Sequence, residues 1–136
     1  MAWQAYNKEF GTLGAIALKA SGAVTTSAAA AAVVVGSGTY QVKVVVSALD
    51  VVNNDEQYLI VIEGNTLAAA STYTEVGNLV LGALEVTGRA ADGVVGTYMV
   101  PITYTGGDKI RIHTYVIGTT PSITFSADVL PLVSVE

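Results

Sequence analysis

The chain has 136 residues, a net charge of −5 and no cysteine. This length suits one domain, the negative charge disfavours nucleic acid and anionic membranes as partners, and the lack of cysteine excludes disulfides and thiolate chemistry. Charged residues make up only 12% of the chain, about half of the usual share. We therefore expect part of the surface to be covered in an oligomer or a larger assembly.

The first eleven residues, MAWQAYNKEFG, differ in composition from the rest. Trp3, Tyr6 and Phe10 are spaced three and four residues apart, so a helical turn would place them on one face. We interpret residues 1–11 as an N-terminal arm and residues 12–136 as a single β-sandwich domain. The arm packs either on its own domain or on a neighbouring molecule, and the sequence leaves both open.

Small residues dominate positions 12–38, which include the stretch TSAAAAAVVVGSG. Its alanines would suit a helix, but the three β-branched valines and the glycines after them favour an extended strand. No apolar run here approaches the roughly 20 residues that span a bilayer. We expect no membrane partner, and a protein that acts where it is made or leaves by cell lysis.

Alternation with a period of two begins at position 39. Tyr40, Val42, Val44 and Val46 fall on one face of a predicted strand. The stretch QYLIVIEGN at 57–65 is apolar on both faces, which predicts a central strand.

Weaker strands are predicted in STYTEVGNLVLGALEV, with breaks at Gly77-Asn78 and Gly82. The next strand contains Pro101, which indicates an edge or a bulge.

Two further strands close the chain, joined by a turn at 118–121. We expect Ile112, Val116, Ile123 and Phe125 to be buried together. Seven to nine short strands separated by turns predict an all-β fold, an antiparallel sandwich or jelly roll.

Residues for chemistry are scarce. His113 is the only histidine of the chain, so a zinc site and a Ser-His-Asp triad are both disfavoured. Asp50, Asp55 and Glu56 are the closest approach to an acidic cluster, but they lack the spacing and the glycine of a calcium loop. We expect no catalytic residue, no metal and no cofactor, hence a protein that is not an enzyme.

Lys109, Arg111, His113 and Tyr115 alternate along the second-last strand, and they hold three of the seven Lys, Arg and His residues (6 Lys+Arg plus 1 His). We interpret this row as an outward sheet face. It is either a plain solvated surface or a contact for an acidic partner.

The order of these elements resembles the short one-domain capsid cement (decoration) proteins of tailed bacteriophages. The likeness covers about residues 36–133 and is clearest in GTYMVPITYTGGDKIRIHTYVIGTTPSITFSADVLPLV. The resemblance implies a jelly-roll-like sandwich on the outer surface of a capsid. It also implies the major capsid protein as partner, and a homo-oligomer, most often a trimer, that clamps neighbouring capsomers.

Two rival functions remain open from the sequence. One is another virion β-module, such as a tail, fibre or receptor-binding domain. The other is a carbohydrate-binding or hydrolytic sandwich. A fibre usually has a stalk repeat or a longer chain, and a sugar binder exposes aromatic side chains on a loop or face. Neither feature is evident here.

Overall fold

The computed structural model of the chain describes residues 15–52, 55–82 and 95–131. Every regular element within these ranges is a β-strand, as the period-two pattern predicts. The strands in chain order are β1 (Ile16–Val24), β2 (Ala28–Ala29), β3 (Val33–Val34), β4 (Gly38–Leu49), β5 (Gln57–Asn65), β6 (Tyr73–Gly82), β7 (Gly96–Tyr104), β8 (Lys109–Ile117) and β9 (Ile123–Pro131).

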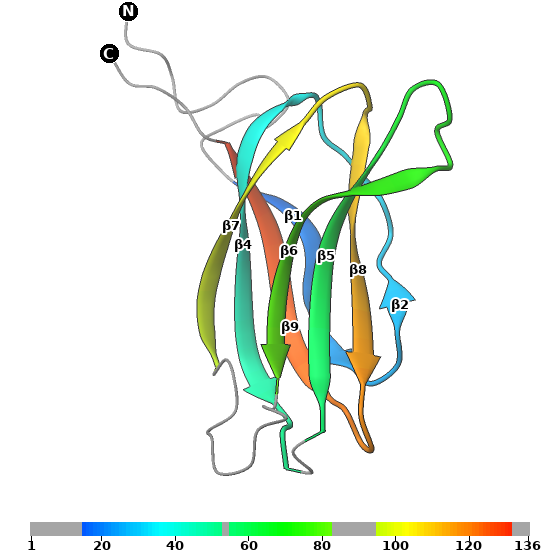
Figure 1. Ribbon diagram of the computed structural model, residues 1–136. Helices are drawn as coiled ribbons and strands as arrows, with labels where there is room; N and C mark the ends of the chain where they lie inside the picture. The colour runs from blue at the N-terminus through cyan, green and yellow to red at the C-terminus, as the bar shows by residue number, and fades with distance from the viewer. Residues whose placement is uncertain (1–14, 53–54, 83–94, 132–136) are drawn as a thin grey trace, which may run out of the picture.

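Two antiparallel sheets face each other in a β-sandwich (Figure 1). The four-stranded sheet has the order β1-β9-β4-β7, and the five-stranded sheet has the order β2-β8-β5-β6, with β3 also pairing with β8. β5 is flanked by β8 and β6, so the prediction of a central strand is confirmed. β7 lies at the end of its sheet, which confirms the edge position indicated by Pro101.

The strand pairings are nested along the chain. The first strand pairs with the last, β2 and β3 pair with β8, β4 pairs with β7, and β5 pairs with β6. The same pairing would be found in one long hairpin whose turn lies between β5 and β6. Here the hairpin is folded so that successive strand pairs lie alternately in the four-stranded and the five-stranded sheet. Residues far apart in sequence therefore become neighbours on each face.

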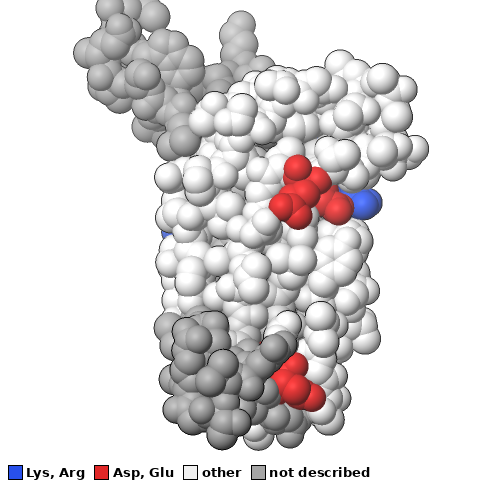
Figure 2. Space-filling model, in the orientation of Figure 1, with Lys and Arg blue, Asp and Glu red and all other residues white. Residues whose placement is uncertain are grey.

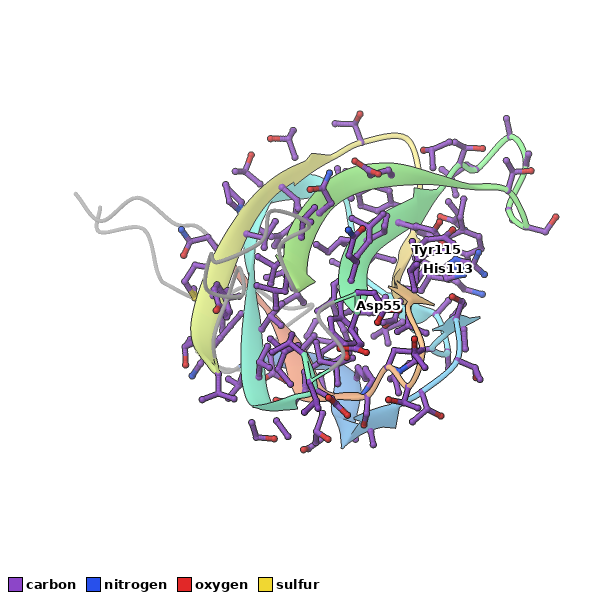
Figure 3. The ribbon with its side chains drawn as sticks, turned by 60° about the horizontal axis from the view of Figure 1, so that its bottom comes forward. Asp55, His113 and Tyr115 are labelled. Atoms are coloured by element: carbon purple, nitrogen blue, oxygen red, sulfur yellow. The ribbon has the colours of Figure 1, made fainter. Side chains whose placement is uncertain are left out.

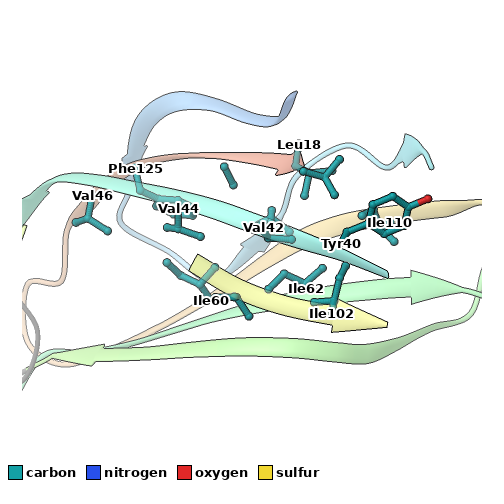
Figure 4. Packing of buried hydrophobic residues seen from close by; sticks show 14 of the residues in the cluster. Leu18, Tyr40, Val42, Val44, Val46, Ile60, Ile62, Ile102, Ile110 and Phe125 are labelled. Atoms are coloured by element: carbon teal, nitrogen blue, oxygen red, sulfur yellow. The ribbon is translucent and has the colours of Figure 1, made fainter. Parts of the chain in front are cut away.

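The core fills the space between the two sheets. Val42 and Val44 of β4 are fully buried and lie across from Ile60 and Ile62 of β5 (Figure 4). The alternation predicted for β4 is thus confirmed, because Tyr40 and Val46 are buried with them. Each such side chain stabilises the fold by about 1.5–3 kcal/mol through burial alone.

The last two strands contribute to both walls of the core, because β8 belongs to the five-stranded sheet and β9 to the four-stranded sheet. Ile112, Ile123 and Phe125 are completely buried, as predicted. Val116 differs: it packs against the core but keeps partial exposure.

The structure differs from the sequence prediction in two strands. The extended segment within 12–38 is divided into β1, β2 and β3. In addition, β6 runs without a break through Gly77-Asn78, where a break was predicted. A Cβ at Gly77 would lie 2.7 Å from Cγ2 of Ile102. Gly77 is therefore needed for close packing of β6 against β7, and it does not end the strand.

A lysine occupies an irregular part of the β1–β9 pairing. The register shifts on both sides of Lys19. Its ammonium donates hydrogen bonds to the carbonyl oxygens of Ala20, Gly22 and Phe125 at 2.9–3.1 Å, and it lies 4.3 Å from the centre of the Phe125 ring. Partial burial lowers the pKa of Lys19. The side chain thus satisfies carbonyl groups that the bulge leaves unpaired.

A buried asparagine fixes the start of β8. The Asn65 Oδ1 accepts hydrogen bonds from the Tyr104 hydroxyl at 2.7 Å and from the backbone N–H groups of Asp108 and Lys109 at 3.0 Å each. Burial raises the pKa of the Tyr104 hydroxyl. These hydrogen bonds hold the backbone at Asp108 and Lys109, and so they set the position at which β8 begins.

Candidate interaction surface

Strand β8 sends alternate side chains into the core and onto the outer face of the five-stranded sheet. Ile110, Ile112 and Thr114 are buried inside. The outward side chains are the predicted row, Lys109, Arg111, His113 and Tyr115. Figure 3 shows His113 and Tyr115 side by side on this strand, and their rings stack with centres 4.2 Å apart.

A nearly buried glutamate on the neighbouring strand organises this row. Glu63 of β5 pairs with Arg111 in the sheet register. The Arg111 Nε donates to Glu63 Oε1 at 2.8 Å, and the His113 Nδ1 lies 3.4 Å from the same oxygen. The guanidinium also lies 4.0 Å from the ring centre of Tyr73. Arg111 is therefore held between a carboxylate and an aromatic face.

The interpretation as a plain solvated face needs correction for the middle of the row. The side chains of Arg111 and His113 are only 28% and 23% exposed, and both contact Glu63. Lys109 and Tyr115, at the two ends, are exposed. The central residues therefore stabilise the surface, and the two ends remain available to a partner.

An apolar patch adjoins the Tyr115 end of the row. A shallow depression of about 210 Å³ is lined mainly by Leu59, Val80, Tyr115 and Ile117. Val80 and Ile117 are 66% and 62% exposed, although both lie within strands. We call these four residues the apolar patch. Clustered apolar groups that face water mark contact sites in soluble proteins.

The turn beyond the patch confirms the prediction for 118–121. Gly118 has φ +124°, and a Cβ there would lie 2.7 Å from Cα of Glu56, so glycine is required. The next residue, Thr119, donates from its hydroxyl to Asp55 at 2.6 Å and from its N–H at 3.2 Å. The hydroxyl of Thr119 is the main cause that lowers the pKa of Asp55.

The predicted acidic cluster separates into different environments. Asp55 is exposed and binds the turn, whereas Glu56 is completely buried. Within the described ranges, no group of three or more His, Asp or Glu side chains is arranged to hold a metal ion. Nor does any helix in this part of the chain have the length and hydrophobicity to cross a membrane.

The aromatic residues of the predicted arm, Trp3, Tyr6 and Phe10, lie outside the described residues. Sequence reasoning missed Glu63 and the apolar patch. Glu63 lies at an outward-facing position in the alternation of β5, so the sequence could have placed it beside the outward row of β8. The patch offered none, because it combines β5, β6 and β8 through a cross-strand register that a single sequence does not reveal.

No protein-family model matches the chain, and the curated proteins contain no significant match.

Proposed function

We propose that this chain is a structural virion protein that binds the outer surface of a tailed-phage capsid and stabilises contacts between capsomers. The observation that carries the proposal is the nested strand pairing across two sheets. It supports the jelly-roll connectivity that the resemblance to cement proteins implies. The major capsid protein is the proposed partner.

The surface composition also supports a contact role. On the face seen in Figure 2, nearly all described surface is uncharged, and acidic residues form two small groups. The centres of protein interfaces are likewise poor in charged side chains. An extended neutral surface suits attachment to another protein better than it suits steering of a charged ligand.

Lys109 is the proposed electrostatic contact with the capsid. It is exposed at one end of the row, and it forms no ion pair with any residue in the described ranges. Arg111, by contrast, is already neutralised by Glu63. A carboxylate on a capsid subunit would therefore find Lys109 accessible.

The first experiment asks where the chain is located. Particles purified from the phage that encodes the chain should carry many copies of it, and an antibody against the folded domain should label intact heads. Particles without the chain should release their DNA at a lower temperature. Absence of the chain from intact particles, or its presence only on tails or inside the shell, would overturn the proposal.

The second experiment compares two charge reversals in binding to particles that lack the chain. Lys109→Glu should weaken binding several-fold at low salt, and added salt should reduce the difference. Lys43→Glu, on the outer face of the other sheet, is the matched control and should bind as the wild type does. Equal binding by both variants would remove Lys109 from the contact.

A further inference from the structure

We propose that the apolar patch is the docking site for the N-terminal arm of a second copy of this chain, with Trp3 as the anchoring side chain. The inference concerns self-association and does not depend on binding to a capsid. It connects the exposed patch with the three aromatic residues of the arm.

The size and chemistry of the patch fit one aromatic side chain. A cavity of about 150 Å³ lined by apolar groups is large enough to bind benzene, and this depression measures about 210 Å³. Leu59, Val80, Tyr115 and Ile117 provide apolar side chains to its lining. The patch is too small for a sheet-to-sheet interface, since stable interfaces bury about 800 Å² on each partner.

The reach of the arm favours a neighbouring molecule over its own domain. β1 begins at Ile16, opposite Val129, and ends at Val24, opposite Ile123, near the turn that follows Ile117. The eight intervals of β1 place its start about 25 Å from that end of the sandwich. Phe10 is six residues before Ile16, so it can extend at most about 20 Å from it.

Trp3 could travel farther, because thirteen residues extend to about 45 Å. To reach the patch of its own domain, the arm would have to run along the domain and then cross from one sheet to the other. The sheets are about 10 Å apart, so this path would use most of the reach of the arm. A neighbour whose patch lies near the start of β1 requires no such stretching. Trp is also one of the side chains enriched among residues that dominate binding energy.

One arm and one patch on each chain make a head-to-tail contact. Such a contact uses two different surfaces, and repeated around an axis it closes into a ring. A three-membered ring would give the trimer expected from the resemblance. The exchange of arms would also place the Trp3 side chain away from water, which its large apolar area favours.

The test uses two full-length variants with complementary defects. The triple variant W3A/Y6A/F10A retains the patch and lacks the aromatic side chains. Ile117→Glu retains the aromatic side chains and places a charge in the patch. Ile117 is largely exposed, so this change should leave the fold intact, and Val80→Glu provides a second patch variant.

Light scattering should show an oligomer for the wild type and a monomer for each variant alone. Val34→Glu, at an equally exposed valine on β3, is the matched control and should stay oligomeric. Equal mixing of the triple variant with Ile117→Glu should restore a 1:1 complex. Only Ile117→Glu contains a tryptophan in this mixture, so its emission should shift to shorter wavelength on mixing.

Three results would overturn the inference. A monomeric wild type excludes self-association. An oligomer that survives both Ile117→Glu and Val80→Glu shows that the contact lies elsewhere. A mixture that stays monomeric, with unchanged emission, shows that the arm packs on its own domain. Each of these measurements is made without capsids, so none of them bears on the proposed attachment to a virion.

Discussion

The two faces of the five-stranded sheet are both shielded from solvent along β5, but by different means. On the inner face, Ile60 and Ile62 are fully buried by the opposite sheet. On the outer face, Val61 and Glu63 are only 3% and 9% exposed although they point away from the four-stranded sheet. The register places His113 and Asn78 on either side of Val61.

The two faces should therefore respond differently to mutation. Inner burial requires the whole sandwich, so it is lost only when the domain unfolds. Outer burial depends on a few polar side chains around Glu63, so it responds to single substitutions. The apolar patch is a third case. Its residues Val80, Tyr115 and Ile117 are exposed, so they should contribute to binding more than to folding.

The largest effect should follow from Phe125→Ala, which empties part of the wall against which the inner face packs. Phe125 is fully buried and also lies beneath the Lys19 ammonium. We expect a loss of about 3–5 kcal/mol in the free energy of unfolding, measured by urea denaturation. Val45→Ala, on the outer side of β4, is the control with a smaller loss. A loss below about 1 kcal/mol for Phe125→Ala would contradict the assignment of this core.

Glu63→Gln tests the shielding of the outer face. The amide keeps the shape of the side chain but removes the charge that pairs with Arg111, which is itself partly exposed. We expect a loss of about 1–2 kcal/mol in the free energy of unfolding. Glu75→Gln is the matched control, since the exposed Glu75 accepts a hydrogen bond from Asn78, and it should change stability by at most about 0.5 kcal/mol. Equal losses would show that the Glu63 contacts are no stronger than ordinary surface contacts.

The exposed hydrogen bond between Thr119 and Asp55 should have a smaller effect on stability. Thr119→Val removes the hydroxyl that lowers the pKa of Asp55 below its ordinary 3.8, and NMR titration of the Asp55 carboxyl should show the pKa rising. A lowered folded-state pKa stabilises the fold above the unfolded-state pKa, and this contribution disappears as the pH falls through the folded-state pKa. The contribution should therefore begin to decline below about pH 4 and vanish only below the lowered folded-state pKa of Asp55. Thr119→Ser keeps the hydroxyl and should keep the low pKa; an unchanged pKa in the valine variant would refute the contact.

The apolar patch should show the smallest effect on folding. In the W3A/Y6A/F10A background, where the aromatic arm does not contribute, Ile117→Thr should alter stability by no more than about 0.5 kcal/mol. Thermal denaturation at low protein concentration is the measurement. A clear drop in melting temperature would mean that Ile117 supports the fold itself, and the distinction between the two kinds of outer residue would fail.

Local patterns in the sequence predicted the strands and their inner faces. The alternation of β4, β8 and β9 is set by the backbone of each strand, so Val42, Ile112 and Phe125 could be assigned to the core from neighbouring residues alone. Pro101 likewise predicted an edge or a bulge, because it lacks an N–H donor, and β7 does lie at the edge of its sheet. The sandwich class follows from these local features.

Features that combine several strands could not be predicted in the same way. Whether Glu63 meets Arg111 depends on the register between β5 and β8, which no local pattern specifies. Gly77 looked like a strand break because its close neighbour, Ile102, belongs to a different sheet. The capsid role rests on a resemblance of strand order and stays a proposal.

The pairing of the first and last strands has a mechanical consequence. Ile16 lies opposite Val129, so tension between the two ends of the described chain would peel β1 from β9 one pair at a time. The first strong obstacle to peeling is Lys19, which must leave the Phe125 carbonyl and ring together. Tension between the start of β1 and the opposite end of the sandwich would instead shear every β1–β9 pair at once. The domain should therefore resist far higher force when it is held by its N-terminal end and pulled along its length.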